Sequence, residues 1–377
     1  MSQASEWLST QLPAMEASLA ALVEINSFTG NREGGQKVVR LLEDVFAMPG
    51  LEGERVGSEK FADHLVFKSA GNGQAPIALI GHSDTVFPPG VFEGYRVDGN
   101  LRRGPGVLDM KGGLVVIAWA LKAVASTVGL DAIPPLRIVI VADEEVGSPE
   151  GAPLLRKVIA GSQAALVFES GRANDALVTM RKGTGSAKAV AIGKPAHAGN
   201  AYWEGANAIW ALSRFVDRVQ QLSSKDSGVT VNVGTISGGT SKNTVPAEAK
   251  AELDLRFPTK VLADELWTKL HDAAGSVAVD GVQVKVEPGA GRMPMEKVQG
   301  TDTLVARYGS CAKSHGLSGD EAPRQGGGSD GNTAAAMGIP TVDALGPRGK
   351  GFHTPDEYIE VDTLISRAQA LADFLVS

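Results

Sequence analysis

Apolar residues follow two different patterns along this chain, and the pattern changes about halfway. In the first part, short apolar runs alternate with stretches in which apolar residues recur at every third and fourth position. The runs predict buried strands, and the recurrence predicts surface helices. We expect strands at residues 76–80, 136–141 and 164–168, and helices at residues 7–22, 36–46, 114–128 and 153–159. Strands that alternate with helices are typical of a mostly parallel α/β sheet.

From about residue 182, longer alternating strands and two helices replace this pattern. Two strand-helix-strand halves of this kind indicate a small α+β domain of ferredoxin-like type. Its strands are expected at residues 184–192, 229–236, 247–257 and 282–286, and its helices at 204–222 and 262–274. The first pattern then resumes with a helix at 303–315, a strand at 340–344 and a C-terminal helix. We therefore predict a mostly parallel α/β domain formed by residues 1–181 and 292–377, with the smaller domain inserted at residues 182–291.

Composition limits the classes of function. A chain of 377 residues is too long for one ordinary core, which agrees with two domains. A net charge of -7 leaves no electrostatic footprint for nucleic acid or an anionic membrane, so neither is an expected partner. The one cysteine, Cys311, cannot form an intrachain disulfide, so a metal site would use His, Asp and Glu. The chain start lacks the features of a signal peptide, and no apolar run could span a bilayer, which predicts a cytoplasmic protein.

Each predicted strand of the first domain ends in histidine or acidic residues. His82 and Asp84 follow the first strand, Glu144 and Glu145 follow the second, and Glu169 follows the third. In open α/β sheets, ligands bind beyond the carboxyl ends of the strands. Singly, these are an ordinary turn histidine with a capping acid, or a solvated acidic turn. Their repetition at strand ends favours a metal site.

Two further residues complete this set. Asp109 lies in a Gly-rich loop at residues 104–113, where capping of the next helix is the alternative role, and His353 lies near the C-terminus. Imidazole and carboxylate ligands suit zinc, with manganese or cobalt as substitutes. Two neighbouring ions need a shared bridge, which a carboxylate such as Asp109 can supply. Glu144, beside these ligands, is in position to act as a general base.

Six motifs occur in a fixed order: GHSDTVFP, GPGVLDMKGG, DEEVGS, VFES, PAHAG and GFHTPDE. In this order they resemble the co-catalytic zinc hydrolases that include glutamate carboxypeptidase, aminoacylase, acetylornithine deacetylase and succinyl-diaminopimelate desuccinylase. The resemblance spans nearly the whole chain and is closest to the glutamate carboxypeptidase-like group. It implies two Zn²⁺ per chain, a general base at Glu144 and a ligand-orienting acid at Asp84. The implied metal ligands are His82, Asp109 as the bridge, Glu145, Glu169 and His353.

The resemblance also assigns roles in the inserted domain, which in this family covers the active site and usually carries the contact of a homodimer. His197 of PAHAG would reach the partner subunit's site and stabilise the oxyanion, although by itself it reads as a turn residue. Asn243 and Arg256 match substrate contacts, and Arg256 suits a carboxylate clamp. Otherwise, an arginine on a strand is a solvated surface residue. Arg292 is a second candidate carboxylate contact, and Gly328 lies in a loop that resembles the one near the substrate backbone.

The implied reaction is hydrolysis of the amide bond of a small peptide or N-acyl amino acid that has a free C-terminal carboxylate. Glu169 favours the carboxypeptidase and deacylase branches, because the di- and tripeptidases tend to have Asp there. An N-acyl-amino-acid deacylase is the alternative. Two other classes are a non-catalytic metal-binding scaffold and an oxidoreductase that uses residues 104–113 as a nucleotide cradle. The loop lacks the GxGxxG spacing after a strand that such a cradle requires.

Overall fold

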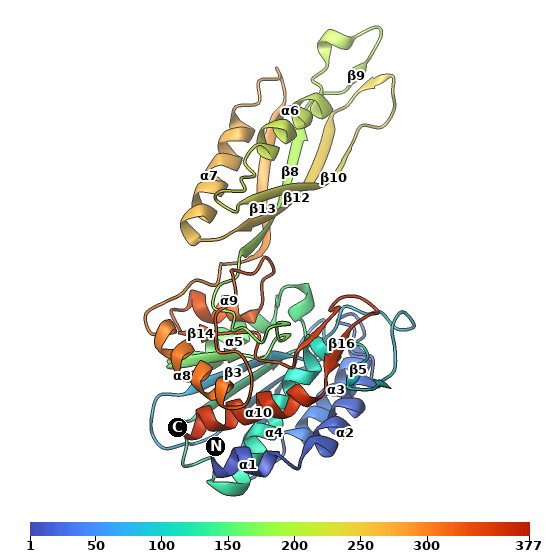
Figure 1. The fold of residues 1–377 in the computed structure, drawn as a ribbon. Coiled ribbons are helices and arrows are strands. Elements are labelled where there is room, and N and C mark those ends of the chain that lie inside the picture. The colour runs from blue at the N-terminus through green and yellow to red at the C-terminus, as the bar shows by residue number, and fades with distance from the viewer. The chain divides into compact units, whose positions relative to one another are not determined.

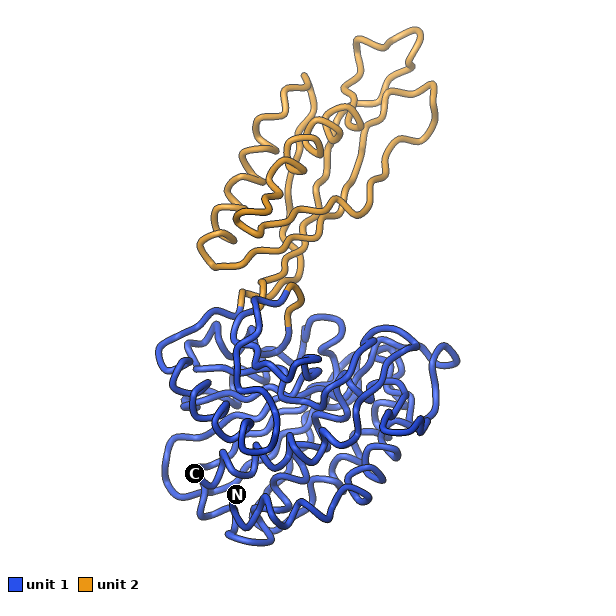
Figure 2. The backbone as a smooth tube through the Cα atoms, viewed as in Figure 1, with its two compact units in different colours: residues 1–180, 295–325, 329–377 blue, residues 181–294, 326–328 orange.

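The computed structural model describes residues 1–377. The chain forms two compact units, which Figure 2 colours separately. Unit 1 comprises Met1–Met180, Met295–Gln325 and Ser329–Ser377, and unit 2 comprises Arg181–Pro294 and Gly326–Gly328. Unit 2 therefore interrupts unit 1 in the sequence.

The centre of unit 1 is a six-stranded sheet in the order β1-β2-β6-β3-β7-β14 (Figure 1). Its strands are β1 (Glu52–Val56), β2 (His64–Lys68), β3 (Ile77–His82), β6 (Leu136–Val141), β7 (Ala164–Val167) and β14 (Thr341–Val342). Strands β6, β3, β7 and β14 run parallel, whereas β1 and β2 are antiparallel to their neighbours. The predicted apolar strands and the mostly parallel sheet are confirmed.

Helices cover both faces of this sheet. They are α1 (Gln3–Leu8), α2 (Leu12–Val23), α3 (Arg32–Val45), α4 (Gly112–Thr127), α5 (Gly151–Ile159), α8 (Thr301–Ser314), α9 (Asp330–Ala336) and α10 (Asp362–Val376). Along β3, Ile77 and Leu79 belong to the larger core with α4, whereas Ala78 and Ile80 belong to a smaller core with α5 and α9. A strand buried on both faces needs apolar residues at every position, which explains the continuous runs.

The predicted helix at residues 7–22 is wrong in one respect, because the structure divides it into α1 and α2. Pro13 lies in the first turn of α2 and has no backbone N–H to donate to the carbonyl of Ser9. A continuous helix would lose that hydrogen bond and place the proline ring against the preceding turn. The spacing of apolar residues continues across this break and so does not predict it.

A second sheet of unit 1, in the order β15-β16-β5-β4, has no counterpart in the sequence prediction. Its strands are β4 (Arg96–Asp98), β5 (Leu101–Arg103), β15 (Gly349–Lys350) and β16 (Tyr358–Glu360). Strands of two or three residues are too short to show a period. This sheet bears two predicted ligands near its strands, because β5 leads into the Gly-rich loop that contains Asp109 and β15 and β16 enclose His353.

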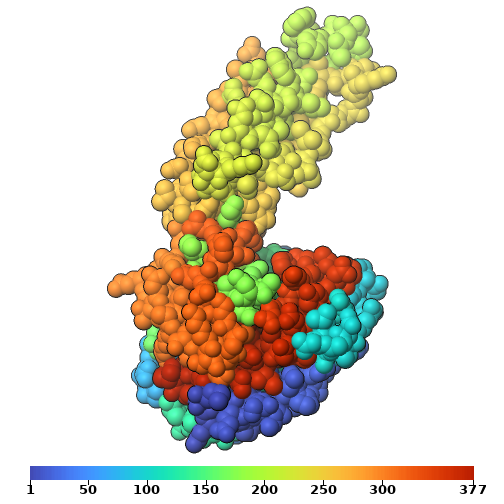
Figure 3. Space-filling model, viewed as in Figure 1, coloured from blue at the N-terminus to red at the C-terminus, as the bar shows by residue number.

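The two ends of the chain meet on unit 1. Helices α1 and α10 pack together, and the backbone N–H and hydroxyl of Ser2 donate hydrogen bonds to Asp373. Figure 3 shows this N-terminal segment in blue beside the red C-terminal segment. No helix of the chain combines the length and the apolar character needed to span a bilayer.

Unit 2 is a four-stranded antiparallel sheet in the order β10-β12-β8-β13, with two helices on one face (Figure 1). Its elements are β8 (Gly183–Ile192), α6 (Ala208–Gln220), β10 (Thr230–Gly238), β12 (Glu248–Phe257), α7 (Lys260–Gly275) and β13 (Gln283–Arg292). This order of strands and helices is ferredoxin-like, as predicted. Beyond one end of the sheet, β9 (Ala196–His197) pairs with β11 (Thr244–Val245).

Candidate metal centre

The strand register brings the predicted strand-end residues together. Strand β3 lies between β6 and β7, and His82 pairs with Val141 while Ile80 pairs with Val167. The segments that follow these three strands therefore leave the sheet side by side. They carry Asp84, Glu144 with Glu145, and Glu169.

Asp109 lies between two histidines. His82 Nε2 is 3.3 Å from Asp109 Oδ1, and His353 Nε2 is 3.4 Å from Asp109 Oδ2. On one side, Glu169 Oε1 is 3.8 Å from His82 Nε2. On the other, Glu145 Oε2 is 3.1 Å from His353 Nε2. The two carboxylate oxygens of Asp109 thus face different imidazoles, each accompanied by a further acid.

Asp84 orients His82 from behind. Its carbonyl oxygen is 3.0 Å from His82 Nδ1, and its Oδ1 is 3.3 Å from the same nitrogen. The carboxylate also accepts hydrogen bonds from the backbone N–H groups of Glu144 and Glu145 and from the hydroxyl of Thr29. Asp84 therefore leaves His82 Nε2 directed at the cluster and holds the segment that carries both glutamates.

Glu144 lies on the Glu169 side of the cluster. One ligand atom from each of His82, Glu144 and Glu169 falls within 4.8 Å of the others, and the same holds for His82, Asp109 and Glu145. Glu144 and Glu145 belong to a short 3-10 turn that follows β6, so adjacent residues reach different sides of the cluster.

The charges of this cluster are strongly coupled. Burial, with the charge of Asp109, raises the pKa of Glu169 to about 7. Hydrogen bonds to Asp109 and Glu145 raise the pKa of His353 to about 10. Burial would lower the pKa of His82, but the charge of Glu169 and hydrogen bonds to Asp109 and Asp84 raise it well above its usual value. The acids outnumber the imidazoles that can carry a compensating charge.

Asp109 and Glu145 respond in opposite directions. Burial would raise the pKa of Asp109, but hydrogen bonds from His353 and His82 hold it below its usual range. Burial, with the charge of Asp109, raises the pKa of Glu145. Glu145 Oε1 is buried and has no hydrogen-bond partner. A buried carboxylate oxygen without a donor, inside an excess of acids, fits a site for divalent cations.

Asp109 does not cap the following helix, so that alternative is wrong. Helix α4 begins after Lys111, which makes no side-chain cap, and the side chain of Asp109 is directed at the two histidines instead. Lys111 itself is fully buried and donates a hydrogen bond to the carbonyl of Ile25. Burial lowers the pKa of Lys111 to about 7.

The prediction did not assign a role to Glu357, the last residue of GFHTPDE. Its side chain is fully buried and accepts hydrogen bonds from the backbone N–H groups of Gly106, Leu108 and Asp109. Burial, with the charge of Asp109, raises the pKa of Glu357 to about 8. These bonds occupy the amides that a nucleotide cradle at residues 104–113 would use, so the structure does not support that alternative.

In unit 2, His197 and Asn243 lie beside each other. Thr244 of β11 pairs with His197 of β9, and both His197 and Asn243 are exposed. His197 Nδ1 accepts hydrogen bonds from the N–H groups of Gly199 at 3.1 Å and Asn200 at 3.0 Å. The loop therefore uses one ring nitrogen and leaves Nε2 to the surface.

Arg256 is not close to Asn243 within one chain. Asn243 precedes the Glu248 end of β12 and Arg256 lies near the other end, so about 20 Å or more separates them at roughly 3.3 Å per residue. Arg256 donates to both oxygens of Asp254, at 2.8 and 2.9 Å. Arg256 and Arg292 both pair with Thr184 of β8, from opposite sides.

Gly328 belongs to the short segment of residues 326–328 that clusters with unit 2. The guanidinium of Arg181 donates a hydrogen bond to the carbonyl of Gly327. Ser329 follows as the N-cap of α9, with Asn332 completing a capping box. The loop that contains Gly328 therefore ends at Ser329, where α9 begins.

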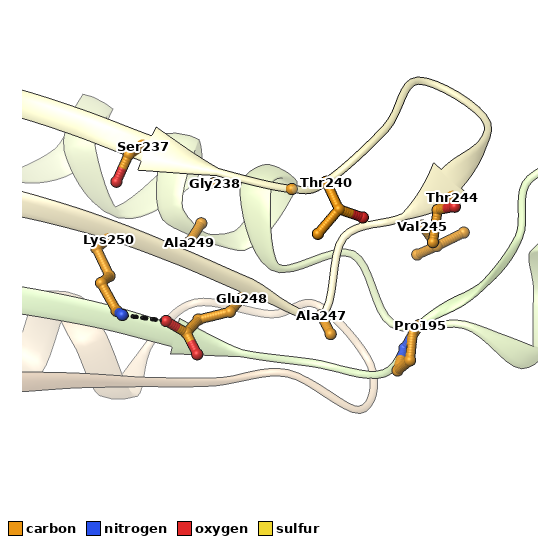
Figure 4. Close-up of a pocket in the computed structure, with 11 residues that line it drawn as sticks. Pro195, Ser237, Gly238, Thr240, Thr244, Val245, Ala247, Glu248, Ala249 and Lys250 are labelled. Atoms are coloured by element: carbon orange, nitrogen blue, oxygen red, sulfur yellow. Dashed lines mark ion pairs between the residues drawn. The ribbon is translucent and has the colours of Figure 1, made fainter.

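Unit 2 also has a pocket of about 480 Å³ between β10, β12 and Pro195 (Figure 4). Apart from the ion pair of Lys250 with Glu248, its lining consists of small and apolar residues and two threonines. None of the clustered acids or histidines lines it. The candidate metal ligands therefore lie outside this pocket.

Comparison with known proteins finds relatives that cover most of the chain. Residues 179–282 match the M20 family profile described as a peptidase dimerisation domain. Carboxypeptidase G2 from Pseudomonas sp. (strain RS-16) is 29% identical over 372 residues, which cover 97% of this chain and 89% of that protein. Acetylornithine deacetylase from Myxococcus xanthus is 32% identical over 273 residues, which cover 66% of this chain and 68% of that protein. The crystal structure of aminopeptidase PepT from Bacillus cereus ATCC 10987 aligns with a TM-score of 0.80 at 22% identity, over 97% of this chain and 98% of that chain.

Fold and sequence together define a hydrolytic enzyme of the metallopeptidase and carboxypeptidase class. The chain belongs to the M20 peptidase family. The resemblance drawn from the motifs is confirmed at this level, and the non-catalytic scaffold is not supported.

Proposed function

We propose that this enzyme hydrolyses the amide bond of an N-acyl or N-peptidyl amino acid with a free carboxylate, using two divalent ions, with Zn²⁺ as the first choice. The observation that carries the proposal is the position of Asp109, whose two oxygens face His82 and His353. A carboxylate can bridge two ions in this way. Zinc suits the imidazole and carboxylate ligands, and Co²⁺ or Mn²⁺ could substitute.

The ligands divide into two sets that share Asp109. His82 and Glu169 would complete one set, and Glu145 and His353 the other. Such a pair of ions, when bound, lowers the pKa of a water molecule and polarises the carbonyl of the scissile amide. Asp84 keeps Nδ1 of His82 occupied, which fixes the ring and leaves Nε2 as the ligand atom.

Glu144 is the proposed general base and acid. It lies beside His82 and Glu169, while its neighbour Glu145 is directed at His353. Glu144 would take the proton of the attacking water and deliver it to the nitrogen of the leaving amine. Two adjacent glutamates thus divide proton transfer from ligation.

His197 is the proposed oxyanion donor. Because the N–H groups of Gly199 and Asn200 donate to Nδ1, the neutral imidazole carries its proton on Nε2, which faces outward. An N–H in that position can donate to the oxygen of a tetrahedral intermediate. Asn243, exposed beside it, would act at the same place.

We propose that His197 acts in a homodimer, at the partner subunit's site. Unit 2 matches a peptidase dimerisation domain, and β10 is one of the two unpaired edges of its sheet. Ile236 on this edge and Ile209 and Trp210 on α6 are exposed apolar side chains. An unpaired edge with apolar residues beside it supports pairing with a second copy.

The substrate carboxylate is assigned to Arg256, with Arg292 as a second contact. Both arginines pair with Thr184, so they lie on the same face of the sheet. They belong to the two strands that flank β8 and are therefore about 10 Å apart. Asp254 holds Nε and Nη2 of Arg256, so Nη1 is the donor available to a ligand. Two guanidinium groups on one face favour an acidic amino acid such as glutamate, while Gly328 would offer its backbone amide.

The relation to acetylornithine deacetylase supports a second candidate, an N-acyl-amino-acid deacylase. Both candidates break the same kind of bond and use the same residues of unit 1. They differ in the acyl group and in the amino acid released, so a substrate panel separates them.

The test is a panel of N-acetyl, N-benzoyl and dipeptide substrates with varied C-terminal residues, followed by release of free amine. We expect activity on free carboxylates, and amidation of the carboxylate should lower kcat/KM by about two orders of magnitude, given roughly 2–5 kcal/mol for truncating a buried charge pair. Arg256→Ala should abolish this preference for a free carboxylate. Equal cleavage of free and amidated substrates would favour an aminopeptidase or general amidase instead.

A further inference from the structure

Two loops that carry proposed metal ligands leave the same small sheet. Strand β5 pairs with β16, with Arg103 opposite Tyr358, and continues into the loop that contains Asp109. Strands β15 and β16 form a hairpin around residues 351–357, which contain His353. The Asp109 loop and the His353 loop therefore adjoin paired strands of the same sheet.

Neither loop holds its own ligand in place by regular structure. His353 has a φ of 63°, its side chain is 48% exposed, and its ring makes its polar contacts with Asp109 and Glu145. Asp109 and Met110 have non-helical backbone angles, and Gly106, three residues before Asp109, has a φ of 76°. Two irregular segments of this kind need a further contact to set the distance between their ligands.

Glu357 supplies that contact. It is the last residue before β16, and its side chain is 0% exposed. Its Oε1 accepts hydrogen bonds from the N–H groups of Leu108 at 2.8 Å and Asp109 at 3.0 Å, and its Oε2 accepts one from Gly106 at 3.2 Å. Three amides of one loop therefore converge on one side chain, and this shared acceptor fixes the backbone of residues 106–109.

We propose that Glu357 is a positioning residue that sets the spacing between Asp109 and His353, and thereby the affinity for the ion held between them. This inference rests on the proposed two-ion function. Glu357 acts through the backbone of residues 106–109, because its two oxygens are used by amides. In Glu357→Gln, an amide N–H of the side chain would face the N–H of Gly106, and two donors cannot form a hydrogen bond with each other. In Glu357→Asp, the side chain would be one methylene too short to reach the three N–H groups.

The test compares Glu357→Gln with Asp356→Asn. Asp356 is exposed, adjacent in sequence, and its side chain makes no hydrogen bond to the Asp109 loop, so Asp356→Asn is a matched control that also replaces a carboxyl group by an amide. Metal-free proteins are titrated with Zn²⁺ by calorimetry and with Co²⁺ by visible absorption. We expect Glu357→Gln to weaken the binding of at least one of the two metal equivalents by about 10–100-fold. It should also change the Co²⁺ spectrum, as for other residues that support a ligand. Asp356→Asn should match the wild type.

Wild-type affinity and an unchanged Co²⁺ spectrum in Glu357→Gln would overturn the proposal, even if its melting temperature falls. If Glu357→Gln does not fold by circular dichroism, Glu357→Asp, which keeps the carboxyl group, is measured in the same way. It should also bind more weakly and alter the spectrum, and wild-type values would again overturn the proposal. A wild-type protein that binds no metal would instead defeat the proposed function, so the two failures are distinguishable.

Discussion

In unit 1 the candidate metal ligands contact one another and most of them are buried or half-buried, whereas His197 and Asn243 of unit 2 are exposed. In unit 1, Asp109 lies between His82 and His353, and Asp84 accepts three hydrogen bonds behind them. In unit 2, His197 is exposed and its ring contacts only backbone amides two and three residues away.

The reason for this difference is electrostatic. Buried charges are costly unless neighbouring groups compensate them, so the acids of unit 1 must be arranged within one chain. Exposed side chains carry no such requirement. Unit 1 therefore has its ligand geometry in a single subunit, while His197 would gain its role only from a second surface, as the proposed dimer provides.

Asp109→Ala should have the largest effect, because this one side chain faces both halves of the cluster. We expect the dialysed variant to lose at least one of two metal equivalents, and its activity to fall by more than the roughly 10⁴-fold upper range for removing a general base. Metal analysis with kinetics measures both, and Asp356→Ala is the surface control. A fully loaded and active variant would rule out a bridge at Asp109.

Glu144→Gln should separate chemistry from metal binding within the same cluster. We expect kcat to fall by about 10²–10⁴-fold while the metal content stays near that of the wild type, because a base is removed and the ligands remain. Glu145→Gln, the adjacent change, should instead lose metal. If Glu144→Gln loses metal or keeps its activity, the roles of the two glutamates are wrongly assigned.

His197→Ala tests the exposed half of the comparison. We expect kcat to fall by about 10²–10³-fold with metal content unchanged, because an oxyanion donor is lost. Mixing this variant with Glu144→Ala should restore part of the activity, since one site of each hybrid dimer then has both groups. A mixed dimer that stays inactive would count against action in the partner's site.

Glu16→Gln should show a smaller, pH-dependent effect on the stability of unit 1. Arg102 donates to both oxygens of Glu16, and this hydrogen bonding lowers the pKa of Glu16. A lowered pKa means that the ion pair stabilises the fold above the ordinary carboxyl pKa of about 4.3 and loses this effect as the pH falls through the lowered value.

We therefore expect the free energy of unfolding in urea to be about 1 kcal/mol higher for the wild type than for Glu16→Gln between pH 5 and 8, allowing for partial exposure of the pair. The difference should shrink below about pH 4. Activity at pH 7 should change little. A difference that persists unchanged at pH 3 would mean that packing, and not charge, is responsible.

Long, regular elements were predictable, and short or irregular ones were not. The buried strands β3, β6 and β7 appear in the sequence as continuous apolar runs, and the four strands of the main sheet of unit 2 and its two helices are nine residues or longer. The break between α1 and α2 depends on one proline, and β15 and β16 are too short to show any alternation.

The site shows the same division. Its histidines and acids were predictable, because strand ends and motif order identify them. Glu357 was not, since a glutamate in a charged turn is usually solvated and its burial depends on the pairing of β16 with β5. The distance between Asn243 and Arg256 also follows from the length of β12 and not from their residue types.

By itself, the sequence determined the fold class, the residues that meet at the strand ends and the resemblance to the co-catalytic hydrolases. Apolar periodicity and residue chemistry are local properties, so they can be read along the chain. Only the tertiary structure decided that Asp109 faces two histidines and does not cap α4, that Glu357 binds the amides of the Asp109 loop, and that Asn243 lies far from Arg256. These relations depend on strand register and burial, which arise from contacts between segments distant in sequence.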